Sequence, residues 1–208
     1  MPRRTIVYVD GFNLYYGAVR GGPHKWLDLE RYFKLLRKDD EIRRICYFTA
    51  LLDGPRRSSQ AAYLRALEQR PLIEIVLGKF KEKQIRCRVE RCKFTGSRMF
   101  TQTEEKRTDV NIAVRMLDDA YRDCCDLFVL VSGDSDLVPA IHAVKARFPK
   151  KQVLVYVPSR NPVRGAAVEL RSAADRHRDL PLAPLKHAQF PRRVPDGAGG
   201  FIEKPSGW

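Results

Sequence analysis

The feature that most restricts the fold of this chain is the alternation of short apolar runs with amphipathic segments. Five runs are mostly apolar and do not alternate between apolar and polar residues, which predicts strands buried on both faces. They are residues 5–9, 42–50, 72–77, 127–131 and 153–157. Between them, apolar residues recur at helical spacing in 27–36, 58–69, 110–121 and 137–144. This alternation predicts an α/β fold with a central, mostly parallel five-stranded sheet flanked by helices.

Two stretches depart from the alternation. Residues 79–100 hold eight basic residues interleaved with apolar ones, which predicts a basic β-hairpin insertion with its turn near Gly96-Ser97. After Leu182 the chain becomes rich in proline, glycine and charge. We therefore expect one domain over residues 1–181 and a flexible tail over 182–208.

The charge balance points to a polyanionic partner. The 208 residues include 39 basic and 25 acidic side chains, a net charge of +14, and such an excess attracts nucleic acid while also occurring in basic proteins that bind none. No run approaches the length of a membrane span, so no membrane partner is expected. Five cysteines, two of them adjacent, suit reduced thiols and a cytoplasmic location. A homodimer or a partner protein is left open.

Acidic residues stand at three places where a predicted strand ends or a predicted helix begins. Asp10 follows the first apolar run, and Asp134 and Asp136 follow the run 127–131. Asp109 opens the helix predicted at 110–121, where Thr108 is a candidate cap. Capping alone explains one acid at a helix start, which leaves Asp109 open to a structural interpretation. It explains the pair Asp134 and Asp136 poorly.

These carboxylates predict a site for a hard divalent cation. The carboxyl ends of parallel strands meet at one edge of a sheet, where α/β proteins place their sites. Carboxylates that converge there repel one another unless a cation neutralises them, and oxygen ligands suit Mg²⁺ or Mn²⁺. In a basic chain, the chemistry that this combination favours is phosphodiester cleavage. Ser132 and Ser135 are candidates for holding a phosphate or water nearby.

At these positions the sequence resembles the NYN-domain family, a LabA-type branch of the PIN-like ribonuclease superfamily. The similar segments are Tyr-Val-Asp-Gly-Phe-Asn-Leu-Tyr-Tyr at 8–16, Glu-Lys-Arg-Thr-Asp-Val-Asn at 105–111, and Val-Ser-Gly-Asp-Ser-Asp-Leu at 131–137. They occur in the order typical of the family. The resemblance implies a PIN-like three-layer sandwich and cleavage of RNA with one or two divalent ions.

The resemblance also implies roles for single residues. The metal site and catalytic set would consist of Asp10, Asp109, Asp134 and Asp136. Asn13 and Ser132 would position phosphate or ligands, with Ser135 and Lys106 as further candidates. Lys106 has a plain surface role as its alternative.

The basic hairpin adds a candidate RNA-binding surface and a cysteine pair. We expect contacts to the RNA backbone from Arg86, Arg88, Arg91 and Lys93, the alternative being a solvated ribbon. Cys87 and Cys92 lack a second cysteine or histidine pair nearby in sequence, so zinc is disfavoured and two ordinary thiols are expected.

Two other functions share these features. One is an RNA-binding or regulatory module of the same fold with little or no catalysis. The other is a phosphatase or a structure-specific DNA nuclease with the same metal chemistry. The complete set of four aspartates favours the enzyme, and we predict a metal-dependent endoribonuclease.

Overall fold

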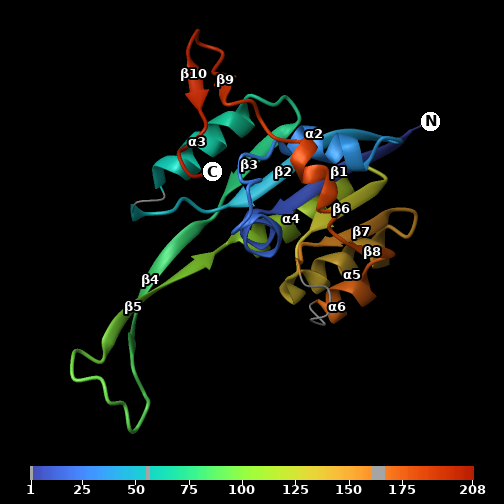
Figure 1. Ribbon diagram of the computed structural model, residues 1–208. Coiled ribbons are helices and arrows are strands. Elements are labelled where there is room, and N and C mark those ends of the chain that lie inside the picture. The colour runs from blue at the N-terminus through green and yellow to red at the C-terminus, as the bar shows by residue number, and fades with distance from the viewer. Residues whose placement is uncertain (1, 55–56, 161–166) are drawn as a thin grey trace.

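A computed structural model describes residues 2–54, 57–160 and 167–208. Its centre is a six-stranded sheet with the strand order β3-β2-β1-β6-β7-β8, in which every neighbouring pair is parallel (Figure 1). The strands are β1 (Arg3–Asp10), β2 (Asp40–Thr49), β3 (Ile73–Leu77), β6 (Leu127–Val131), β7 (Gln152–Val157) and β8 (Arg176–Asp179). The predicted α/β class is confirmed, and the five predicted strands are all present.

The sixth strand, β8, corrects the predicted strand number. Its four residues, Arg-His-Arg-Asp, are all exposed at the edge of the sheet next to β7. An edge strand of charged residues has no apolar signature, so its sequence gives no sign of a strand.

Helices cover both faces of the sheet. One face carries α1 (Gly11–Leu14), the π-helical turn η1 (Tyr15–Val19), α2 (Leu29–Leu36) and α3 (Arg57–Glu68). The other carries η3 (Ser135–Leu137), α4 (Thr108–Tyr121), α5 (Val138–Arg147) and α6 (Val168–Ala173). The four predicted helices correspond to α2, α3, α4 and α5. No helix within the described ranges is both long and apolar enough to cross a membrane.

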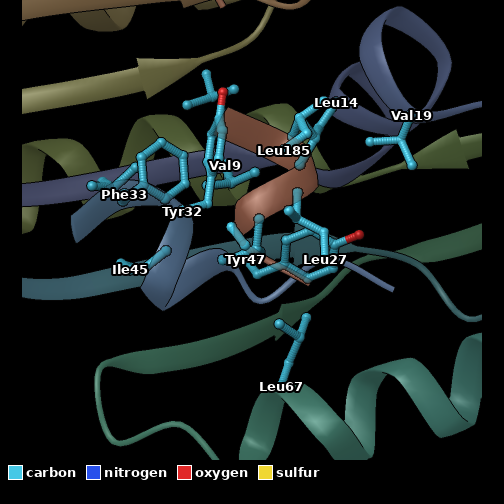
Figure 2. Close-up of a cluster of buried hydrophobic side chains, with 14 of the residues drawn as sticks. Val9, Leu14, Val19, Leu27, Tyr32, Phe33, Ile45, Tyr47, Leu67 and Leu185 are labelled. Atoms are coloured by element: carbon cyan, nitrogen blue, oxygen red, sulfur yellow. The ribbon is translucent and has the colours of Figure 1, made fainter. Parts of the chain in front are cut away.

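Alternate residues of the strands supply two separate cores. In β1, Val7 and Val9 face the layer of α2 and α3, whereas Ile6 and Tyr8 face the layer of α4 and α5. Figure 2 shows part of the first core, in which Val9, Tyr47 and Leu27 lie among the buried side chains. Because strands apolar on both sides need cover on both sides, the three-layer arrangement follows from the sequence pattern.

The predicted basic hairpin is present and projects from the body of the molecule (Figure 1). It pairs β4 (Lys79–Arg86) with β5 (Met99–Lys106) in an antiparallel register from Lys79 opposite Lys106 to Arg86 opposite Met99. The hairpin thus extends past residue 100, where the sequence predicted its end. Gly96 and Ser97 lie in the connection 87–98, which is longer than a tight turn.

Residues 182–208 are folded against the body, contrary to the flexible tail predicted from their composition. They form η4 (Ala183–His187) and a small hairpin of β9 (Arg193–Pro195) and β10 (Phe201–Glu203). Phe190 packs 5.6 Å from the ring of Trp26, whose Nε1 donates a hydrogen bond to the carbonyl of Pro191 at 2.8 Å. Single apolar residues fill gaps over the sheet here, and because they follow no helical or strand period, the sequence pattern does not detect them.

Candidate active site

Asp10 is the most firmly held acidic residue at the carboxyl edge of the sheet. It ends β1, caps α1, and is only 3% exposed. Asn13 donates to Asp10 Oδ1 through its backbone N–H at 2.9 Å and to Oδ2 through Nδ2 at 2.6 Å. Ser132 Oγ donates to Oδ2 at 3.0 Å. The next residue, Gly11, lies so close to Phe48 that an added Cβ would stand 2.7 Å from its carbonyl oxygen.

A hydrogen-bond network joins the end of β1 to the end of its neighbour β6. Asn13 Oδ1 accepts from the backbone N–H of Gly133 at 3.1 Å, and Ser132 Oγ accepts from that of Asp134 at 3.1 Å. Asp134 in turn caps η3, with its Oδ1 accepting from the N–H of Asp136 at 3.0 Å. Asn13 and Ser132 therefore act by fixing Asp10 relative to Asp134.

Asp109 reaches the site from α4, but the start of this helix differs from the prediction. The capping residue is Arg107, in a left-handed conformation with φ of 81°, and Thr108 is already helical. The Thr108 hydroxyl donates to Glu105 Oε1 and does not cap the helix. Strand β5 runs into α4 through this single left-handed residue, so the chain has no extended cap position left for Thr108. Asp109 lies half-buried in the first turn.

The charges of these residues act on one another. Burial and then the charges of Asp134, Asp10 and Asp136 raise the pKa of Asp109 to about 6. Burial raises the pKa of Asp10, while the hydrogen bonds from Asn13 and Ser132 lower it in part. The charges of the other three carboxylates all act on Asp109, so these side chains lie near one another. We refer to Asp10, Asp109, Asp134 and Asp136 as the acidic cluster.

The side chains of the acidic cluster, as they are placed, do not form the coordination shell of a metal ion. Within the described ranges, no three His, Cys, Asp or Glu side chains stand close enough together to hold a metal ion as they are placed. The donor atoms of the cluster are all carboxylate oxygens, a set that fits Mg²⁺ or Mn²⁺.

Glu105 is a neighbour of the cluster that the sequence analysis did not select. Burial, with the charges of Asp10 and Asp109, raises its pKa to about 7, against the lowering effect of the hydrogen bond from Thr108. The signal for Glu105 is strand alternation: Glu104 and Lys106 share one face of β5 and pair at 2.9 Å, which leaves Glu105 on the other face.

The remaining predicted residues lie outside this network. Lys106 pairs with Glu104, and Ser135 is exposed in η3. The predicted RNA contacts are all exposed, on β4 or in the connection 87–98 at the far end of the hairpin (Figure 1). These are Arg86, Arg88, Arg91 and Lys93.

Cys87 and Cys92 lie side by side as free thiols at the end of the hairpin. Hydrogen bonds from the backbone of Val89 and from the side chain of Cys92 lower the pKa of Cys87. Among the described residues, no further ligand joins them in a metal-binding group.

Comparisons with known proteins bear on the family and the fold. A family model described as "NYN domain" matches residues 4–181. A solved structure of a protein of unknown function from Vibrio parahaemolyticus has the same fold, with a TM-score of 0.56 and 20% identity over 86% of this chain and 94% of that one. The central parallel sheet and this likeness fit a PIN-like fold.

A curated relative carries a different kind of name. The 6-hydroxy-3-succinoylpyridine 3-monooxygenase of Pseudomonas putida is 30% identical over 242 aligned positions, which cover 100% of this chain and 76% of that protein. By its name, that protein acts on a substituted pyridine ring.

Proposed function

The chain belongs to the NYN-domain family, and from this membership we propose that it is a metal-dependent endoribonuclease. The observation that carries the proposal is the convergence of carboxylates from three separate segments at one edge of the sheet, where the charges of three raise the pKa of the fourth. The four catalytic residues of the proposal form the acidic cluster. They are Asp10, Asp109, Asp134 and Asp136.

The cluster fits one or two Mg²⁺ or Mn²⁺ ions. Hard cations prefer carboxylate oxygen, and they relieve the repulsion that these side chains exert on one another. Zinc is disfavoured, since it prefers sulfur and nitrogen ligands and the thiols of Cys87 and Cys92 lie on the hairpin. When bound, the ion would supply Lewis-acid activation of the scissile phosphate.

The residues around the cluster fix its orientation. Oδ2 of Asp10 accepts two hydrogen bonds and Oδ1 accepts one, so Oδ1 retains a lone pair for a ligand. Asp134 and Asp136 extend the donor set from η3. Asp109 orients the attacking water, and Glu105 can receive a proton at Oε2 because Thr108 occupies Oε1.

The basic hairpin provides the proposed contact to RNA outside the cluster. Arg86, Arg88 and Arg91 are exposed at its far end. Arginines in this position neutralise phosphates and extend the bound length of a single strand. This arrangement supports a polymeric substrate and cleavage within it.

A second candidate function follows from the curated relative. The 30% identity to a pyridine-ring monooxygenase covers the whole of this chain, and an aromatic cavity adjoins the acidic cluster at Gly11 and Phe12. Oxygenation of a hydroxypyridine would need O₂ and an electron donor such as a reduced nicotinamide.

The experiment compares the two functions on one preparation. End-labelled single-stranded RNA, the DNA of the same sequence and 6-hydroxy-3-succinoylpyridine with NADH are each incubated with the protein in Mg²⁺, Mn²⁺ or EDTA. We expect internal cleavage of RNA with either metal and none in EDTA. Cleavage of DNA alone would indicate a DNA nuclease, and binding without cleavage would indicate a regulatory module.

Asp134→Asn is the most informative variant. Asparagine also caps helices, so η3 keeps its start and Asp10 keeps its hydrogen bonds. Asp10→Asn is less suitable, because its amide nitrogen would face the donors of Asn13 or Ser132. The matched control is Asp118→Asn on the exposed side of α4. Equal cleavage by wild type and Asp134→Asn would assign the activity to a contaminant and defeat the proposal.

A further inference from the structure

A cavity of about 300 Å³ opens beside the acidic cluster and has no part in the ribonuclease chemistry proposed above. It lies between α1 with η1, the carboxyl end of β2, the first turns of α3 and residues 206–208. Its walls share Leu14, Val19 and Leu27 with the core of Figure 2. Its volume is at the lower end of the range for ligand pockets, which suits one ring system and its immediate substituents.

Tyr47 connects the cavity with the acidic cluster. Its ring and hydroxyl lie against Gly11, since a Cβ added to that glycine would stand 2.8 Å from both Cζ and the hydroxyl oxygen. Burial, and then the charges of Asp10 and Glu105, raise the pKa of Tyr47. The cavity is lined by Gly11, the residue after Asp10, and therefore lies beside the acidic cluster.

The hydroxyl of Tyr47 is also a polar group without a partner. Tyr47 is 7% exposed, and among the described residues no other group forms a hydrogen bond with its hydroxyl. The hydroxyl oxygen is not among the fully buried atoms that lack a partner, so it is accessible from the cavity that Tyr47 lines. A ligand in the cavity can therefore form a hydrogen bond with it.

The other walls suit a planar heteroaromatic ring. Tyr47, Tyr63 and Trp208 line the cavity, with Tyr63 6.2 Å from Tyr47 and 5.6 Å from Trp208 between ring centroids. Polar groups stand among the rings, namely those of Thr49, Ser59, Gln60 and Lys25. Aromatic faces with a few placed polar groups are typical of sites that hold a nitrogen heterocycle.

Aromatic side chains also join the cavity to the base of the hairpin. Phe80 of β4 packs 5.5 Å from Phe12, and Phe12 stacks 6.3 Å from Tyr16, which is 54% exposed. The guanidinium of Arg20 lies 5.2 Å from the Tyr16 ring centroid. Exposed rings beside arginines are the surfaces on which single-stranded nucleic acids stack their bases.

We propose that this cavity receives one nucleobase of the RNA substrate, next to the phosphate that the acidic cluster cleaves. The assignment of the ring to a nucleobase rests on the proposed ribonuclease function. The cavity holds the base against the rings of Tyr63 and Trp208, and the Tyr47 hydroxyl bonds to its edge. The rings of Phe12 and Tyr16 stack the neighbouring bases, while the basic hairpin follows the phosphates.

The test measures binding separately from cleavage. A fluorescein-labelled hexanucleotide RNA is titrated in EDTA, and its anisotropy is compared with that of hexamers that carry one abasic ribose at each position in turn. Loss of one base from an aromatic stack typically weakens binding by about tenfold. We expect this loss at one position for the wild type, and nearly equal binding of all hexamers by Trp208→Ala.

Two further variants control for folding. Phe201→Ala removes an exposed ring from β10, outside the cavity, and should keep the abasic discrimination. Tyr47→Phe keeps the ring and removes only the unpartnered hydroxyl, so it should weaken binding of the intact hexamer while leaving thermal stability unchanged. If Trp208→Ala lowers the melting temperature, its loss of abasic discrimination could reflect misfolding, and the RNA affinity of Tyr47→Phe then decides the test.

The outcomes separate this inference from the proposed function. Equal binding of every hexamer by the wild type overturns the nucleobase site, even if RNA is cleaved. Abasic discrimination without cleavage in Mn²⁺ supports the site and defeats the ribonuclease proposal. A third outcome is that all hexamers bind equally and that free 6-hydroxy-3-succinoylpyridine binds saturably to the wild type but not to Trp208→Ala. This result would assign the cavity to a free heterocycle and overturn the inference.

Discussion

Replacing Asp109 with asparagine should stabilise the protein when no divalent cation is present and abolish its proposed activity. In the folded chain, burial and the charges of the other three aspartates of the cluster raise the pKa of Asp109 from 3.8 to about 6. Near neutral pH the protein therefore carries a carboxylate whose ionisation opposes folding. Asparagine removes the charge and keeps nearly the same shape.

The expected gain is about 1 kcal/mol. One pKa unit corresponds to about 1.4 kcal/mol, so the full rise would correspond to about 3 kcal/mol in a dry interior. Asp109 is only half-buried, and solvent screening reduces this figure to about 1.5 kcal/mol. Asparagine also loses the attraction between the carboxylate and the N-terminus of α4, which is about 0.5 kcal/mol. For a chain of this size the net gain raises the melting temperature by about 2–4 °C.

The sign of the pH dependence follows from the raised pKa. Below the unfolded-state pKa of about 4, Asp109 is protonated in both states and its charge has no effect on stability. The penalty grows as the pH rises from about 4 to about 6, between the two pKa values, and it is complete above about pH 7. The advantage of Asp109→Asn over the wild type should therefore be largest at neutral pH and vanish in mild acid.

Urea denaturation in EDTA, followed by far-ultraviolet circular dichroism near pH 7.5 and near pH 4.5, measures this difference. The matched control, Asp118→Asn, lies on the same helix but forms a surface pair with Arg122 and should show no gain. Millimolar Mg²⁺ should stabilise the wild type more than Asp109→Asn. A variant less stable than the wild type at neutral pH, or a gain that does not change with pH, would refute the electrostatic reasoning.

Three further predictions concern the hairpin, the last segment and the site's backbone. The triple variant Arg86→Ala, Arg88→Ala, Arg91→Ala should bind single-stranded RNA more weakly and reduce the dependence of log affinity on log salt concentration by about 2. The control Arg31→Ala, Lys38→Ala, Lys150→Ala removes the same charge elsewhere and should do neither. An unchanged salt dependence in the hairpin variant would show that the hairpin does not contact RNA. Phe190→Ala should lower the free energy of unfolding by about 3 kcal/mol, as measured in urea, and a flexible segment 182–208 would instead show no loss. Gly17→Ala should destabilise the fold by about 2 kcal/mol or more, because the new Cβ would stand 2.1 Å from the Pro158 carbonyl oxygen; a normal melting temperature would contradict that contact.

The sheet was predictable because its signal is strong and local. The runs in β1, β6 and β7 are apolar along their length, and those in β2 and β3 are interrupted only by Arg43, Arg44 and Glu74. Runs of this kind favour a sheet covered on both faces. The edge strand β8 and the segment 182–208 carry no periodic signal. Their positions are set by contacts such as that between Phe190 and Trp26, which join residues far apart in the sequence.

The acidic residues of the candidate site were also predictable from a local signal in the sequence. The groups around them, Glu105 and the aromatic cavity, were only partly predictable. A strand that ends in an acid followed by glycine places that acid at the carboxyl edge whatever the rest of the fold does. Glu105 could have been found from the alternation along β5. The aromatic cavity could not, because Tyr47, Tyr63 and Trp208 come from three elements whose approach depends on how residues 206–208 pack.

The two candidate chemistries require different parts of this molecule. A monooxygenase for a free pyridine ring would use the cavity beside Asp10, and it would have no need of an arm that projects from the body. The hairpin from Lys79 to Lys106 is such an arm, and it exposes Arg86, Arg88 and Arg91 far from the acidic cluster (Figure 1). Only a ligand long enough to contact the arm and the cluster together uses both, and a phosphate polymer that places one base in the cavity meets that condition. The alignment with the relative named as a monooxygenase also spans the hairpin, so the proposal of RNA as the substrate depends on a measurement, namely loss of RNA affinity when the hairpin arginines are neutralised.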